Sequence, residues 1–117
     1  MGHASKKKIP LRFFQSFDGV EPVRDWLKSL DVIDRHAIGL DLMRAQWRWP
    51  IGMPLCRPLG GGLWEVRTAL PSHRIARVPF CFVDSELVAL HGFIKKTQKI
   101  PDVELELAHR RRKEMWK

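Results

Sequence analysis

The sequence predicts an α+β fold: one domain in which an antiparallel β-sheet carries an N-terminal helical hairpin and a C-terminal helix. Apolar residues follow a helical period from Pro22 to about Trp49 and an alternating, strand-like period from residue 55. A last helix opens at Pro101, with acidic residues near its start and basic residues near its end. A length of 117 residues and an apolar fraction of 44% suit one hydrophobic core.

The first element expected is a strand over residues 9–17, which the turn signal Asp18-Gly19 ends. Pro22 stands where a first helical residue often stands, and the apolar residues after it share one helical face. Asp31 is suited to cap a second helix that runs to about Trp49. The two helices therefore form a hairpin.

The second helix has two neighbouring apolar stripes. Together they make a broad apolar face, which predicts a helix pressed between its hairpin partner and the sheet. One stripe contains Ile33, Ala37 and Leu40, and the other contains Ile38, Leu42, Ala45 and Trp49.

Three runs rich in branched and aromatic residues follow, over 62–70, 73–83 and 86–96. Short turns separate them, so the sequence predicts an antiparallel meander. Pro79 lies within the second run and cannot donate to a ladder. We therefore expect a bulge or an unpaired edge at that position.

Composition excludes several classes of protein. No segment is apolar and long enough to span a bilayer, and no secretory signal is visible. Cys56 and Cys81 are too few for a disulfide framework and lack partners for a zinc site, so we expect buried reduced thiols, no metal, no cofactor and a cytoplasmic location. Residues 1–8 predict a flexible basic tail ahead of a domain over 9–117.

The net charge of +8, with an isoelectric point near 10.1, is the most informative part of the composition. So basic a domain attracts polyanions, which it binds with a salt-dependent affinity. An acidic protein partner is the alternative, and composition does not separate the two.

The alternation of side chains along the expected strands predicts where much of this positive charge lies. Arg67, Arg77 and the pair Lys95–Lys96 arrive from three strands that we expect to be neighbours, in rows that also hold aromatic rings such as Phe93. Cations that hold phosphates beside rings that stack on bases suit RNA.

Individual residues have simpler explanations as well. Arg74 is a candidate RNA contact, yet lone strand arginines often make salt bridges. His91 is equally compatible with a structural and a catalytic role. The basic helix end at 110–113 also matches the helix dipole.

In order, the motifs LGGGLWEVR, RIARV, LHGFIKKTQKIP and ELELAHRR, preceded by DGVEPVRDWLKSL, resemble the RelE/HigB-type toxins of bacterial toxin–antitoxin modules. The resemblance is to their phage-derived, HigB-like branch and covers roughly residues 9 to 114. It implies a RelE-like fold and metal-independent cleavage of messenger RNA, in most members on the ribosome. Such activity inhibits translation and arrests growth. The implied partner is a cognate antitoxin, often of helix-turn-helix type.

The resemblance also implies roles for the site residues. Arg67 would stabilise the charge-rich phosphorane, and Arg77 occupies the family's other recurrent arginine position, where it would act in catalysis or order the sheet. Lys95 or Lys96 would bind phosphate or take part in proton transfer, and His91 is the better proton carrier by its ordinary pKa. RNA contacts are expected from the residues Lys95, Arg74, Lys99 and Phe93. The chain contains no tyrosine, although relatives often carry one near the site.

Two other functions stay open. A ParE-like gyrase inhibitor shares the fold and acts by binding a protein. A non-catalytic nucleic-acid-binding module is the second, including a helix-turn-helix over residues 22–49. That motif needs a basic face on its second helix, which Asp34 and Asp41 interrupt.

Overall fold

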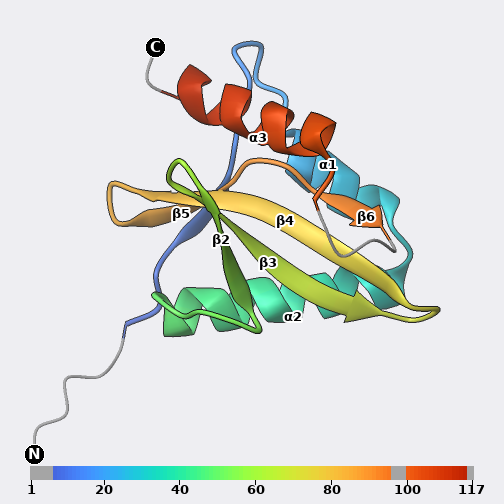
Figure 1. Ribbon diagram of the computed structural model, residues 1–117. Helices are drawn as coiled ribbons and strands as arrows, with labels where there is room; N and C mark the ends of the chain where they lie inside the picture. The colour runs from blue at the N-terminus through green and yellow to red at the C-terminus, as the bar shows by residue number, and fades with distance from the viewer. Residues whose placement is uncertain (1–6, 96–99, 116–117) are drawn as a thin grey trace, which may run out of the picture.

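One β-sheet lies between helices in the computed structural model, which describes residues 7–95 and 100–115 (Figure 1). Its elements are, in chain order, β1 (Leu11–Phe13), α1 (Pro22–Ser29), α2 (Val32–Arg48), β2 (Cys56–Gly60), β3 (Leu63–Leu70), β4 (Arg74–Val83), β5 (Glu86–Ala89), β6 (Phe93–Lys95) and α3 (Asp102–Glu114).

The sheet is mixed. Its strand order is β1-β5-β4-β3-β2, and β6 pairs with β4 beyond the end of β5. The α+β class is confirmed, but the expectation of a wholly antiparallel sheet is wrong because β1 runs parallel to β5. Between β1 and β5 the chain passes through two helices and three strands, so no tight turn forces these two strands to be antiparallel.

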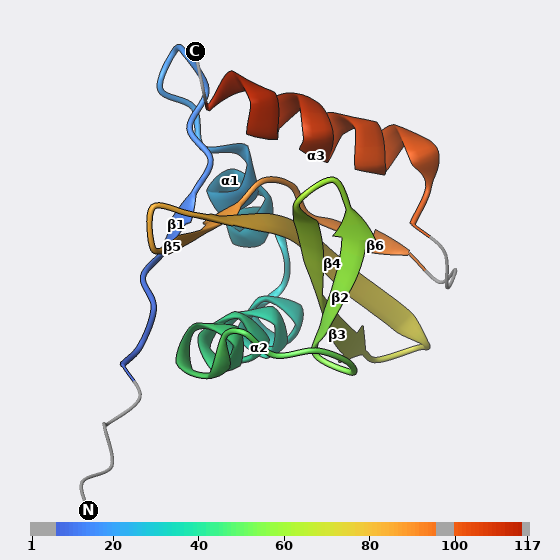
Figure 2. The same cartoon turned by 60° about the vertical axis from the view of Figure 1, so that its left-hand side comes forward.

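Helices cover both faces of the sheet. Figure 2 shows α2 on one face and α3 on the other. The larger core lies between α2 and the sheet, and a smaller one lies under α3. The larger core includes Ile38, Leu42, Ala45, Cys56, Val66, Val78 and Phe80; the smaller one includes Phe14, Leu63, Cys81, Val88 and Ala108.

The predicted helix ends agree with the structure. Pro22 is the first residue of α1, and the Asp31 side chain accepts a hydrogen bond of 3.0 Å from the backbone N–H of Asp34 at the start of α2. Helix α3 begins directly after Pro101, with acidic residues in its first turn and basic residues in its last.

The packing predicted for α2 is half wrong. The stripe that contains Ile38 and Leu42 faces the sheet, but Ile33 and Leu40 in the other stripe are exposed to solvent. Helix α1 precedes α2 and is joined to it by a short turn, yet it lies against β1 and the bend before β6 and does not cover that stripe.

The last predicted strand is split in two. Pro79 pairs with Glu65 of β3, and its carbonyl accepts the N–H of Leu90 on the other side. The N–H and the carbonyl of one strand residue point to the same side, so the N–H that proline lacks faces the gap between β5 and β6. Pro79 therefore lies inside the paired strand β4. The N–H that it lacks coincides with the gap between β5 and β6 on the neighbouring side.

A strand that the sequence pattern missed, β2, forms a hairpin with β3 through a turn of glycines. Gly62 has a φ of +84°, and a Cβ there would lie 2.8 Å from the Arg112 side chain of α3. Only glycine combines that backbone conformation with so close an approach. The tip of this hairpin therefore meets α3, as Figure 2 shows.

Candidate nucleic-acid interface

The strand register brings several predicted residues into one row on the α3 side of the sheet. Arg67 of β3 lies opposite Arg77 of β4, which lies opposite Phe93 of β6. Lys95 lies two residues farther along β6, on the same face. Helix α3 packs over another part of this face, around Leu63.

Glu65 joins this row as its acidic member. Its Oε1 accepts a hydrogen bond of 2.9 Å from Arg77 Nη1, and neither side chain has any exposed surface. The same oxygen lies 3.9 Å from Arg67 Nε. The Arg67 side chain is mostly buried but keeps 18% of its surface exposed, unlike the fully buried pair beside it.

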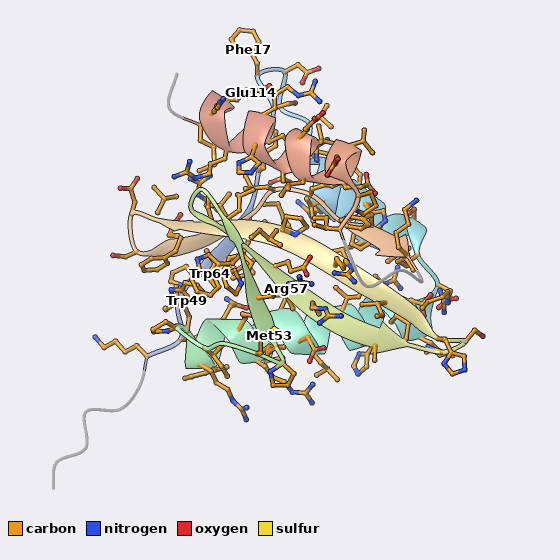
Figure 3. All side chains as sticks on the ribbon, viewed as in Figure 1. Phe17, Trp49, Met53, Arg57, Trp64 and Glu114 are labelled. Carbon is orange, nitrogen blue, oxygen red and sulfur yellow. The ribbon has the colours of Figure 1, made fainter. Side chains whose placement is uncertain are left out.

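Among the described residues of this cluster, basic side chains outnumber acidic ones. Burial lowers the pKa of the Arg77 guanidinium, Glu65 raises it, and the neighbouring charges of Arg67 and Arg57 lower it. Arg57 stands on β2 directly opposite Glu65, where Figure 3 labels it beside β3. One carboxylate thus lies among three guanidiniums, an arrangement that favours an added anion at the open side.

The burial of Arg77 bears on its predicted catalytic role. A guanidinium with no exposed surface does not contact a phosphate in solution. Its geometry supports the second role expected for it, ordering the sheet, because it joins β4 to Glu65 of β3 through a buried hydrogen bond.

Arg74 makes the salt bridge that was its alternative explanation. Its two terminal nitrogens lie 2.7 Å and 3.0 Å from the carboxylate oxygens of Asp34 on α2, and the hydrogen bond to Asp34 raises the pKa of Arg74. The pair joins β4 to α2 on the face opposite Arg67. That placement does not support an RNA contact.

His91 is held between the sheet and α3. Its Nε2 lies 3.0 Å from Glu104 Oε1, and its Nδ1 lies 3.4 Å from Nη1 of Arg111. The structural role is thus realised in the geometry, while the catalytic role stays a prediction.

Phe93 stacks on the His91 ring, with centroids 5.5 Å apart and planes at 29°. It is buried, so it presents no face for a base in this conformation. Lys95 is exposed at the end of β6. Lys96 and Lys99 lie outside the described residues, as do residues 1–6 of the predicted tail.

Sequence reasoning missed Glu65 and Arg57 as site residues. Alternation along β3 does place Glu65 beside Arg67, and an acidic residue in a basic row is a signal for an ion pair. No sequence pattern indicated Arg57 as a site residue, because Pro58 and Gly60 are more typical of a loop than of the strand β2.

The described residues contain no group of three histidine, cysteine or acidic side chains placed to hold a metal ion. Both cysteines are buried free thiols, as predicted. No helix in the described part of the chain is long and apolar enough to cross a membrane.

Fold and site together define a small α+β domain with a basic, arginine-lined sheet face. A family model described as phage-derived protein Gp49-like (DUF891) matches residues 25–113. The chain therefore belongs to the Gp49-like family of phage-derived proteins, which is a RelE-like toxin family. A comparison with curated proteins gives no significant match.

Proposed function

We propose that this protein is the toxin of a type II toxin–antitoxin module and that it cleaves messenger RNA on the ribosome without a metal ion. Its site of action is the bacterial cytoplasm. Its partner is a cognate antitoxin, in our proposal one with a helix-turn-helix domain. Membership of the Gp49-like family supports the toxin role.

One observation carries the proposal of an RNA site. Arg67 is a partly exposed arginine beside a buried ion pair, in a cluster where the described cations outnumber the described acids. A phosphodiester bound there would place its negative charge beside guanidiniums in surroundings that are partly shielded from water. Electrostatic stabilisation of a phosphorane is strongest in such a setting.

The proposed chemistry is internal transesterification. The ribose 2′-hydroxyl attacks the adjacent phosphorus, an O2′–P bond forms and the P–O5′ bond breaks, which leaves a 2′,3′-cyclic phosphate and a 5′-hydroxyl. Arg67 stabilises the phosphorane, and Lys95 binds a neighbouring phosphate. We assign proton transfer to His91 or to Lys96.

Glu65 and Arg77 act in this scheme as positioning residues. Both are fully buried on the face of the sheet that also carries Arg67, and the Glu65 carboxylate lies 3.9 Å from Arg67 Nε. A guanidinium held in advance stabilises a transition state without reorganising when charge develops.

The helix-turn-helix alternative gains no support from the geometry. Its proposed recognition helix, α2, packs one face against the sheet, and its outer face carries Ile33 and Leu40 where a DNA-binding helix needs cations.

The test is controlled expression in bacteria of the wild type, Arg67→Ala and Arg24→Ala. Arg24 is an exposed arginine of α1 outside the site, so its loss matches the charge change. We expect wild type and Arg24→Ala to arrest growth and to produce new message 5′ ends in frame. Arg67→Ala should reduce cleavage by about 100-fold, the usual effect of losing one preorganised donor.

Two results would contradict the proposal. Arrest without message cleavage would favour a gyrase-type or other binding mechanism, and equal potency of Arg67→Ala would remove Arg67 from the site. Soluble yield and circular dichroism of each variant separate lost function from lost folding.

A further inference from the structure

The outer face of α2 is apolar. Residues of an α-helix are 100° apart, so the side opposite the buried Ile38, Leu42 and Ala45 is the side turned to solvent. We call this side the α2 seam; it consists of Val32, Ile33, His36, Leu40, Met43 and Trp47, all of them exposed.

Such a face is unusual on a surface helix. The outward side of an amphipathic helix normally carries charged and polar residues, and a helix that is apolar all round is normally buried. Ile33, Leu40, Met43 and Trp47 are nevertheless between 37% and 68% exposed. Figures 1 and 2 show no described element on the outer side of α2. The salt bridge of Asp34 to Arg74 and the core residues fix which side faces outward.

The spacing and shape of the seam suit a partner helix. The steps from Ile33 through His36, Leu40 and Met43 to Trp47 are three, four, three and four residues, the spacing at which helices interlock. Gly39 has nothing within 4 Å of the place where a side chain would begin. It leaves a shallow hollow of about 490 Å³ beside His36 and Met43, in which a side chain of a partner could sit.

Arginines flank the seam. Arg35 lies along one side, and Arg44 and Arg48 lie along the other. Asp41 is an acidic residue on the same side as Arg44 and Arg48, and its Oδ1 accepts a hydrogen bond of 2.6 Å from Arg44. A partner with carboxylates beside its apolar stripe therefore complements these flanks.

We propose that the α2 seam is the docking site for an acidic amphipathic helix of a protein partner. A second copy of the chain is disfavoured because it would bring basic flanks together and carries a net charge of +8. An anionic bilayer would match the charge, but it requires neither the regular spacing nor the hollow at Gly39. This binding goes beyond the proposed RNA cleavage and does not depend on it.

The test uses the full chain and synthetic three-heptad helical peptides. One peptide has leucine at its seam positions and glutamate at its flanks; the matched control has lysine in place of each glutamate. Binding is measured by fluorescence anisotropy for the wild type, for Leu40→Glu/Met43→Glu, and for Val103→Glu. Val103 is an exposed apolar residue of α3, so that variant places a new charge on a helix away from the seam.

We expect the acidic peptide to bind wild type and Val103→Glu equally and to bind the double variant about tenfold more weakly or worse. The lysine peptide should bind wild type at least about tenfold more weakly than the acidic one. The replaced residues are exposed, so the substitutions leave the core unchanged, and circular dichroism checks that each variant is folded.

Several outcomes would overturn the proposal: no binding of the acidic peptide, equal binding of both peptides, or full binding by the double variant. So would a wild-type dimer in sedimentation that Leu40→Glu/Met43→Glu disperses. Seam-dependent binding to phosphatidylglycerol–phosphatidylcholine vesicles in place of the peptide would assign the seam to a membrane surface.

Discussion

Arg67 lies beside an acidic neighbour that is itself buried. Glu65 lies fully inside the sheet with Arg77, and its second oxygen has no hydrogen-bond partner among the described residues. A buried pair of this kind contributes little net stability, but removing one member leaves an uncompensated charge. Its retention in so small a core fits a role in orienting Arg67.

Glu65→Ala should therefore lower the free energy of unfolding by about 3–5 kcal/mol. The double variant Glu65→Leu/Arg77→Met, which removes both charges, should stay within about 1.5 kcal/mol of wild type. Urea denaturation measures both. A loss below about 1 kcal/mol for Glu65→Ala would show that the pair is not the buried ion pair described.

A second residue-scale prediction concerns Cys56. Burial, reinforced by the charge of Asp41, raises the pKa of this thiol from 9.0 to about 11. The unfolded chain ionises its thiol near pH 9, so the stabilising contribution is complete below pH 9 and is lost as pH rises toward 11.

Relative to a Cys56→Ala variant, wild type should lose up to about 2–3 kcal/mol of stability across that interval. Denaturation curves at several pH values measure the difference, and the alanine variant removes contributions from all other groups. If the free energy of unfolding changed with pH in the same way for both proteins, the raised pKa of Cys56 would be contradicted.

Among the elements, the bend between β5 and β6 depends on a contact with α1. A Cβ added to Gly92 would lie 2.4 Å from two ring carbons of Trp26, whereas nothing lies near the corresponding position at Gly39 of α2. The same substitution should thus have opposite effects at the two glycines.

Gly92→Ala should destabilise the protein by about 1–3 kcal/mol through overpacking. Gly39→Ala should stabilise it by about 0.5–1 kcal/mol, because alanine restricts the unfolded chain and favours helix. Thermal or urea unfolding measures both changes. Equal effects at the two positions would show that Trp26 does not lie against the bend.

For the whole molecule, local signals predict the helices and the β3–β4 hairpin well. The cap at Asp31 and the period of α2 depend on nearby residues alone. The parallel pairing of β1 with β5 and the end of β5 at Ala89 depend on contacts between distant segments. The periodicity of the sequence does not reveal such contacts. Nor does the pattern tell which apolar stripe of α2 the sheet covers.

The candidate site, like the fold, was predictable only where it depends on residues close in sequence. Alternation places Glu65 and Arg67 on one face, and the register adds Arg77 and Phe93 to it. The burial of Arg77 was not visible, since it follows from Glu65 supplying a partner across the strands. His91 is similarly defined by Glu104 of a distant helix.

We propose cleavage of ribosome-bound messenger RNA by the face of the sheet that carries Arg67. Its most direct test is the cellular experiment repeated with purified components: single-turnover cleavage of a message on programmed ribosomes by wild type, Arg67→Ala and Arg24→Ala. We expect wild type and Arg24→Ala to cut at the same position with equal rates, and Arg67→Ala to be slower by about 100-fold. No cleavage by folded wild-type protein, or equal rates for all three, would contradict the account.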